Sequence, residues 1–335
     1  MKDELRSAAK QLFYMVYPAL RALWFPIKYF EYFAVHPLLS LLPLAWAHRI
    51  FRLRWPWLLL MPSEKELILR NLSDAFRGTL SPSQLSATGS AYARFLSCLR
   101  FDAWISSACS AERLNQAVRF EGISCLREAQ KKGKAVVLLG CHTGYFYRFV
   151  FALARNGYRH QVITMRTEET GRIVWRGRAE RILYRRILER MEREKNIRVI
   201  YAGRAYRAIQ AALEEGRVLL TKMDTPMPTE GDKGVSARFL GRQCVFPAEI
   251  FRMAKQHGAV CLPYIVHVDK HLCKIEIHPP WEPGCVGAPP EYEIPEQVGY
   301  FIRLFEQHIL SFPEQWWLWR DLGAFGIPCV PHARA

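Results

Sequence analysis

The chain has 335 residues, of which 50% are hydrophobic and 23% charged, a balance that can bury a large core and excludes an intrinsically disordered protein. Its 20 glycines and 20 prolines exclude a collagen-like or low-complexity architecture. The 47 Lys and Arg residues against 31 Asp and Glu give a formal net charge of +16. Such a surplus predicts a polyanionic neighbour, which could be nucleic acid, an anionic lipid surface, a phosphorylated substrate or an acidic carrier protein.

Nine cysteines are spread along the chain, and no two of them form a CxxC pair. This spacing removes the usual support for a zinc ribbon or a thioredoxin-like redox site. Cysteines inside apolar runs, such as Cys261, are expected to behave as small buried hydrophobic residues, which favours a reducing compartment. No other group of residues has the spacing of metal ligands, so we predict neither a bound metal nor a cofactor.

The first 60 residues are rich in aromatic and aliphatic side chains and lack the basic start and clean apolar core of a secretory signal. Their longest charge-free stretch, 32–47, has 16 residues, whereas a membrane-spanning helix needs about 20 predominantly apolar residues. We therefore predict one or two helices lying in a membrane interface, with a helical hairpin packed on the protein's own core as the alternative. The rings expected at headgroup depth and the cations expected at lipid phosphates are Trp24, Phe25, Tyr29, Phe30, Phe33 and Trp46, and Arg21, Lys28, Arg49, Arg52 and Arg54.

Beyond this appendage at 1–60, helix and strand patterns alternate, which predicts one α/β domain over 61–335 with a largely parallel central sheet. Ser81-Pro82 is typical of a helix start. Strands are expected at 118–120, 135–140, 161–165, 197–201, 217–223, 259–267 and 272–277, and helices at 83–117, 125–132, 145–155, 171–195, 206–215 and 248–257.

The loop after the apolar strand 135–140 contains His142 and Gly144. Open α/β sheets bind their ligands at the carboxyl ends of the strands, so His142 is a candidate catalytic residue. A glycine two residues later lets the backbone turn sharply or approach a substrate closely, which makes Gly144 a candidate substrate-binding residue. A lone histidine is more often structural, so position alone does not decide its role.

Short motifs follow one another along nearly the whole chain, and their order and spacing are more specific than any one of them. They are the aromatic amino end, Asn71-Leu72 with Ala75-Phe76, His142-x-Gly144, Met165-Arg166, Asp224 after a strand, Phe239-Leu240-Gly241, His257-Gly258-Ala259, and Pro313-Glu314-Gln315-Trp316. In this order the chain resembles the lipid A lauroyl/myristoyl acyltransferases, part of the lysophospholipid and glycerolipid acyltransferase superfamily.

The resemblance implies a mostly parallel mixed sheet flanked by helices, with membrane-associated helices at the amino end. It also implies a histidine, matched by His142, that acts as general base on an acceptor hydroxyl, which then attacks an acyl thioester. In that family an acid five positions later orients the histidine, but here the fifth position is Tyr147. A phenol with a reference pKa of about 10 cannot supply a carboxylate's charge at neutral pH.

Three interpretations of this departure remain open. Tyr147 could hydrogen-bond His142 and form a weaker dyad. Another carboxylate could replace the missing acid; we hypothesise Glu249, which begins a helix where the family usually has a small residue, with Asp224 and Glu230 as further candidates. In the third interpretation the fold binds lipid or carrier without transferring acyl groups.

The segment 166–207 has 13 Arg and Lys residues against 6 acidic ones. Arg166, Arg172 and Arg176 are therefore candidate substrate-binding residues, because guanidinium groups suit phosphate and carboxylate. The alternative is a solvated helix face with internal ion pairs. A tryptophan cluster at 316–319 is interpreted as core packing.

Together these observations predict an acyltransferase at the cytoplasmic face of the inner membrane, held there as a peripheral or monotopic protein. It would move a fatty acyl chain from acyl carrier protein (ACP) or coenzyme A (CoA) to a hydroxyl or amine of an amphiphilic, phosphorylated acceptor such as a lipid A precursor. Its partners would be membrane lipids and the thioester donor. Nucleic acid is not expected, because no recognisable reader module accompanies the positive charge.

Overall fold

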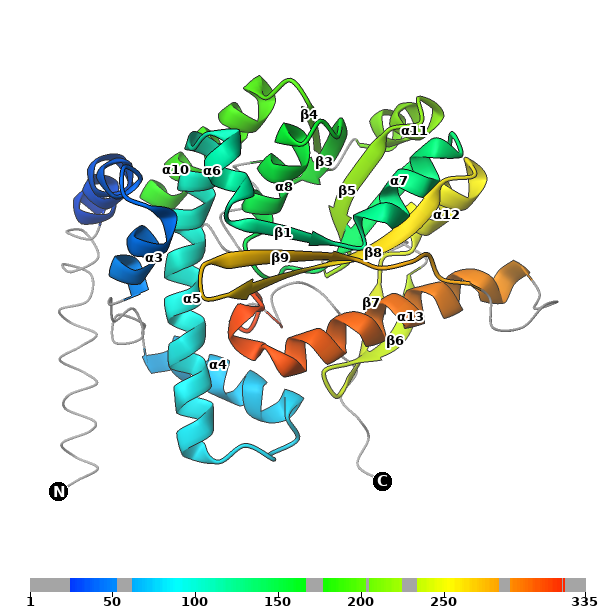
Figure 1. Ribbon diagram of the computed structural model, residues 1–335. Helices are drawn as coiled ribbons and strands as arrows, with labels where there is room; N and C mark the ends of the chain where they lie inside the picture. Colours follow the sequence, from blue (N-terminus) through cyan, green and yellow to red (C-terminus); the bar gives the residue numbers. More distant parts are fainter. Residues whose placement is uncertain are drawn as a thin grey trace.

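The computed structural model describes residues 25–52, 62–166, 177–202, 205–224, 234–282, 290–320 and 322. A seven-stranded sheet with helices around it forms the centre of the molecule (Figure 1). The strand order is β1-β9-β8-β2-β5-β3-β4, and every neighbouring pair is parallel except the β8–β9 hairpin. The predicted α/β fold with a mostly parallel mixed sheet is confirmed.

The strands are short and most lie close to their predicted positions. They are β1 (Val118–Glu121), β2 (Val136–Gly140), β3 (His160–Thr164), β4 (Ile197–Tyr201), β5 (Val218–Lys222), β8 (Val260–Asp269) and β9 (Leu272–Ile277). All five residues of β2 are buried, because this strand lies between β8 and β5 and is covered on both faces. A separate antiparallel pair, β6 (Val235–Phe239) and β7 (Arg242–Phe246), was not predicted.

Helices cover the sheet and extend beyond it. They are α4 (Pro62–Ala75), α5 (Pro82–Ala108), α6 (Ala111–Asn115), α7 (Ile123–Lys131), α8 (Phe146–Arg155), α10 (Arg178–Arg193), α11 (Tyr206–Glu214), α12 (Glu249–Gln256) and α13 (Pro290–Ser311), with a short 3-10 helix, η3 (Pro313–Gln315). The start of α5 is the predicted one: Ser81 caps it and Gln84 completes a capping box. The long helix α13 was not predicted.

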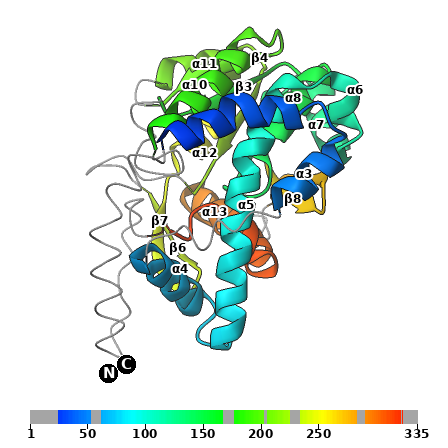
Figure 2. The ribbon, with the colours of Figure 1, turned by 90° about the vertical axis from the view of Figure 1, so that its left-hand side faces the viewer.

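The described part of the amino end is helical and has two different faces. It contains η1 (Glu31–Val35), α2 (His36–Leu39) and α3 (Leu44–Arg52), and α3 runs beside α5 (Figure 2). Tyr32, Ala47 and Phe51 are buried in the same core as the rest of the molecule. Other large apolar side chains are exposed: Ile27, Tyr29, Phe30, Leu38, Leu41, Leu42, Trp46 and Ile50. The packing on the protein's own core is therefore found on one face, and contact of the other face with a membrane stays a prediction.

A buried ionic cluster links α3 to the α/β domain. Arg148 of α8 pairs with Asp102 of α5, and its guanidinium also lies 2.9 Å from Nε2 of His48 of α3. Nη1 of Arg148 donates to the carbonyl of His271, in the turn between β8 and β9, at 2.6 Å. A buried charge needs such partners, because removing one of them leaves the others unpaired in a low-dielectric interior.

The proposed division into 1–60 and 61–335 stays a prediction, although the described part of the first segment shares the core of the second. None of the helices that the structure describes is long and apolar enough to cross a bilayer. Of the predicted interfacial side chains, Arg21, Trp24 and Arg54 lie outside the described residues.

Candidate active site

His142 lies in the loop that leaves β2, and Asp224 lies two residues beyond the end of β5. These two strands are neighbours in parallel register, with Gly140 paired to Lys222, so the loops that follow them meet at one edge of the sheet. Nδ1 of His142 is 2.7 Å from Oδ1 of Asp224. The backbone N–H of His142 also donates to Asp224, at 2.8 Å to Oδ2 and 3.0 Å to Oδ1.

Asp224 is a buried carboxylate that the site keeps ionised. Its Oδ2 accepts a further hydrogen bond from Nε1 of Trp316 at 2.9 Å. Burial alone would raise the pKa of Asp224, but His142 and the hydrogen bonds from His142 and Trp316 outweigh burial and lower this pKa below its ordinary value. Because an ionised carboxylate only accepts hydrogen bonds, it fixes the His142 proton on Nδ1 and leaves Nε2 able to accept another.

The His142 side chain remains 14% exposed, so its ring is not sealed in the core. Burial lowers the pKa of His142 from its ordinary value, Asp224 acts in the opposite direction, and the nearby Lys222 lowers it again. The imidazole is therefore neutral at neutral pH and can act as a base. An aspartate on Nδ1 would stabilise the imidazolium formed when Nε2 takes a proton.

The segment after η3 holds the histidine loop in place. The backbone N–H of Trp317 donates to the carbonyl of His142 at 2.9 Å, and its indole Nε1 donates to the carbonyl of Gly144 at 3.1 Å. Tyr92 of α5 in turn donates to the carbonyl of Trp317 at 2.8 Å, and Asn71 of α4 donates to that of Trp319 at 2.7 Å. The tryptophan cluster is thus more than core packing, since it supplies hydrogen bonds to both members of the His–Asp pair.

Gly144 turns the chain between these elements. It has a φ of +58°, and a Cβ built on it would lie 2.3 Å from the carbonyl oxygen of Val266 in β8. The residue is buried and its N–H donates to the carbonyl of Gln315 at 3.3 Å. Of the two roles proposed for this glycine, the turn is the one that the structure supports. A substrate contact of Gly144 stays a prediction, and the burial of the residue does not favour it.

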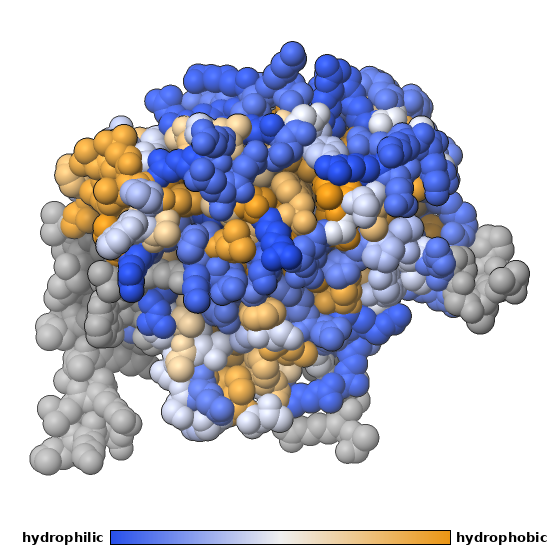
Figure 3. All heavy atoms as spheres, in the orientation of Figure 1, coloured by the Kyte–Doolittle hydropathy of each residue, from blue (hydrophilic) through white to orange (hydrophobic). Residues whose placement is uncertain are grey.

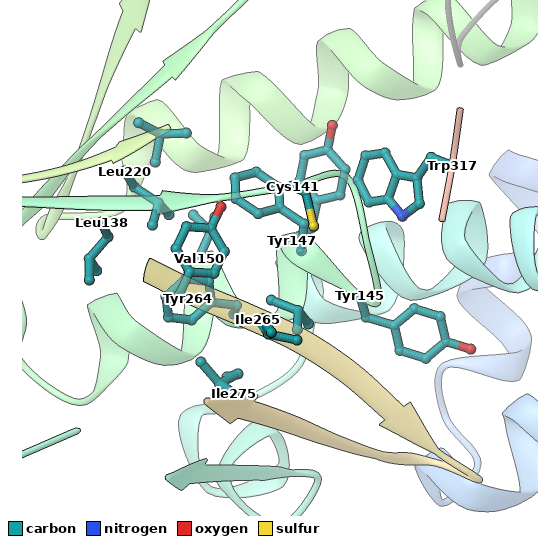
Figure 4. Packing of buried hydrophobic residues seen from close by; sticks show 14 of the residues in the cluster. Leu138, Cys141, Tyr145, Tyr147, Val150, Leu220, Tyr264, Ile265, Ile275 and Trp317 are labelled. Atoms are coloured by element: carbon teal, nitrogen blue, oxygen red, sulfur yellow. The ribbon is translucent and has the colours of Figure 1, made fainter. Parts of the chain in front are cut away.

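Tyr147 does not take the place of the missing acid. Its side chain is buried on α8, with its ring stacked on that of Trp317 at 6.3 Å between centroids (Figure 4). The His142 ring makes its hydrogen bond with Asp224, and none joins it to Tyr147. The hypothesis of a Tyr147–His142 dyad is therefore wrong. The carboxylate that contacts the His142 ring is that of Asp224, one of the candidates of the second interpretation; that it takes over the role of the missing acid stays a prediction.

Glu249 is not that carboxylate. It stands in the first turn of α12, where a negative charge suits the helix dipole, and it pairs with Arg252 at 3.2 Å. Its side chain is 53% exposed and makes no hydrogen bond with His142. The signal that identifies Asp224 is topological: it follows the strand next to the histidine's strand, so both side chains arrive at the same edge.

The candidate arginines are not brought to the dyad by any contact that is described. Arg166 is exposed, and its guanidinium lies 5.7 Å from the centre of the Tyr201 ring. Arg172, Arg176 and the further candidate acid Glu230 lie outside the described residues, so their roles stay predictions. Among the residues that the structure describes, no group of three His, Cys, Asp or Glu side chains is arranged to hold a metal ion.

Comparison with protein families gives a match over most of the chain. The model of the family described as bacterial lipid A biosynthesis acyltransferase matches residues 19–322. Comparison with curated proteins gives no match. Among solved structures, the chain is similar to the 1-acyl-sn-glycerophosphate (LPA) acyltransferase PlsC from Thermotoga maritima at 14% identity and a TM-score of 0.33, over 80% of this chain and 97% of that one. So distant a structural similarity says nothing about the site.

Proposed function

Because the chain belongs to the bacterial lipid A biosynthesis acyltransferase family and is an acyltransferase, we propose that it moves a fatty acyl chain from a thioester to an amphiphilic, phosphorylated acceptor. The donor would be acyl-ACP or acyl-CoA. The acceptor group would be a hydroxyl or an amine, as on a lipid A precursor. The observation that carries the proposal is the His142–Asp224 pair, a partly exposed base with an ionised carboxylate on its far nitrogen.

In the proposed reaction this pair moves the proton between the two substrates. Nε2 of His142 takes the proton of the acceptor O–H or N–H as the oxygen or nitrogen attacks the thioester carbonyl carbon. The resulting tetrahedral intermediate collapses, its C–S bond breaks, and the leaving thiolate takes the proton back from the His142 imidazolium. Asp224 holds the ring in the required tautomer and stabilises the imidazolium throughout. The products are an ester or amide and a free thiol.

The contact between Asp224 and His142 supports an active enzyme over an inactive relative. Asp224, in the loop after β5, places a negative charge beside the imidazole, as an acid at position 147 in α8 would do. General-base assistance is worth roughly 10²–10⁴ in rate, and it depends on this orientation. An inactive, lipid-binding relative would have no use for a buried carboxylate that costs desolvation energy.

Association with the membrane is the second part of the proposal. Hydrophobic atoms gather over the amino-terminal helices, at the upper left of Figure 3. Trp46 and Ile50 of α3 are 60% and 42% exposed. A hollow of about 430 Å³ beside them is lined in part by Arg49 and, from the β8–β9 turn, Lys270. Apolar side chains next to cations suit an anionic leaflet, which supports peripheral binding at the cytoplasmic face of the inner membrane.

The test is acyl transfer by the purified full chain. It would be assayed with long-chain acyl-ACP and acyl-CoA donors and a lipid A precursor, with release of free thiol and mass spectrometry of the lipid as readouts. We expect His142→Ala to abolish transfer while binding to anionic lipid vesicles stays unchanged. Mass spectrometry of lipids from cells with and without the gene would identify the acceptor class. Absence of transfer by the unaltered chain with every donor would favour the lipid- or carrier-binding alternative.

A further inference from the structure

Lys222 lies at the same sheet edge as the His–Asp pair, and its chemistry is not yet accounted for. It is the last residue of β5 and pairs in register with Gly140 of β2. Asp224 lies two residues after Lys222 in the chain, and His142 lies two residues after Gly140. The lysine therefore enters the site from the strand that also delivers the carboxylate.

Aromatic rings hold the ammonium group of Lys222. Its Nζ lies 3.6 Å from the centre of the Phe146 ring and 4.5 Å from that of the Trp317 ring. The ring of His142 lies 5.3 Å from the same Trp317 ring, so imidazole and ammonium both border one indole. Ring faces attract a cation, but they replace only part of the hydration that burial removes.

We propose that Lys222 is a catalytic residue whose ammonium group stabilises the oxyanion of the tetrahedral intermediate. When the acceptor attacks, the electron pair of the thioester C=O bond moves onto its oxygen, and an N–H of Lys222 donates a hydrogen bond to that oxygen. When the intermediate collapses, the C=O bond re-forms, the C–S bond breaks and Lys222 keeps its proton. The proposal rests on the acyl transfer proposed above.

The electrostatics of the site agree with this role. Burial lowers the pKa of Lys222 to about 7, against the attraction of Asp224 and Cys141. Among the described residues, the groups near it include Asp224 from the loop after β5 and Cys141 and His142 from the loop after β2, together with the two neutral rings. A hydrogen bond from an ammonium group to an oxyanion is worth most in such a water-poor site.

Arg166 was the cation that the sequence suggested for this purpose. Its exposed guanidinium lies over Tyr201 at the end of β4, the far edge strand of the sheet, whereas β5 is the direct neighbour of the histidine's strand. Lys222 is thus better placed than Arg166 to meet a charge that forms beside His142.

The experiment compares Lys222→Met, which removes the charge at similar length, with Lys222→Arg, which keeps it at every pH. Lys131→Met, at an exposed lysine of α7, is the matched control. Removal of one oxyanion donor costs about 10²–10³ in kcat, so we expect a loss of that size in Lys222→Met with KM changed less than threefold. Lys222→Arg should retain activity within about tenfold of the unaltered enzyme, since its charge is kept.

The pH profile separates this role from a merely structural one. For the unaltered enzyme we expect kcat/KM to fall as pH rises through about 7, where Lys222 loses its proton, and we expect Lys222→Arg to lose this alkaline limb. A kcat in Lys222→Met within threefold of the unaltered enzyme, or an unchanged alkaline limb in Lys222→Arg, would overturn the proposal while His142→Ala still tests the acyl transfer itself. If the unaltered chain transfers nothing, both proposals fail together.

Discussion

At the scale of single residues, the site pairs His142 with a carboxylate that comes from a loop far away in the chain. The acid five positions after the histidine is absent, and Asp224 fills that place 82 residues away, with Trp316 and the His142 backbone as its other hydrogen-bond donors. Position 147 is then free to hold an aromatic ring that packs on Trp317. The loss of a motif residue therefore does not by itself imply the loss of chemistry.

The acidic side of the plot of kcat/KM against pH, called the acid limb below, tests this arrangement. His142 must be neutral to accept a proton, and its pKa is lowered from the ordinary value of 6.5 because burial outweighs the attraction of Asp224. We expect kcat/KM to hold as pH falls to 6.5 and to decrease only below it. Replacing Asp224 by Asn removes an attraction that raises this pKa, so the limb should move to still lower pH. A limb at or above pH 6.5 in the unaltered enzyme would contradict this assignment.

At the scale of elements, two adjacent strands and the segment after η3 build the site, and the loop between β2 and α8 is the part with the least freedom. Gly144 requires a left-handed backbone and lies against the carbonyl of Val266, while Trp317 donates hydrogen bonds to the carbonyls of His142 and of Gly144 itself. The loop is therefore fixed from β8 on one side and from the carboxyl-terminal segment on the other.

Substitution of Gly144 tests that fixation. Gly144→Ala should lower both stability and kcat, because its Cβ would clash with backbone that cannot move aside. Gly133→Ala is the matched control: it has the same sign of φ, at +68°, but nothing lies within 4 Å of its Cβ, so it should cost only the roughly 1–2 kcal/mol of a left-handed alanine. Thermal unfolding and kcat measured together would check this. Equal losses in the two variants would show that the packing on Val266 is unimportant.

Many of these elements could be predicted from the sequence, since the apolar run of β2, the Ser81 cap and the alternation of helix and strand are local signals. The β6–β7 pair was missed because β7 does not alternate polar and apolar residues and each strand is only five residues long. The partner of His142 was misassigned because hydrogen bonds between distant loops leave no local pattern. Glu249 looked like a compensating acid, yet helix-dipole and Arg252 contacts explain it.

At the scale of the whole molecule, the amino-terminal helices bury one face against α5 and expose the other. Buried Tyr32, Ala47 and Phe51 join the common core, and the Arg148 cluster fastens α3. The exposed face carries Trp46 and neighbouring apolar side chains. A surface of this kind is unusual on a protein that meets only water, and it suits a lipid headgroup region.

Charge substitutions on this face test the proposed membrane binding. Trp46→Glu combined with Ile50→Glu should reduce sedimentation with vesicles of anionic phospholipid at least tenfold, because the change adds charge where apolar area would be buried. Tyr206→Glu, at an aromatic side chain of α11 that is 51% exposed, is the control and should bind as before. Activity on a soluble thioester in detergent should survive in both variants. Undiminished vesicle binding by the double variant would show that another surface meets the lipid.

The most direct test of the account replaces each of two acids by its amide and measures kcat/KM for acyl transfer. Asp224→Asn keeps the shape of the side chain but removes the charge that fixes and stabilises the His142 ring, and a loss of about 10²–10⁴ is expected. Glu249→Gln makes the same chemical change at an exposed site paired with Arg252, and it should stay within twofold of the unaltered enzyme. An Asp224→Asn enzyme within threefold of the unaltered one, or a Glu249→Gln enzyme as impaired as Asp224→Asn, would contradict the account.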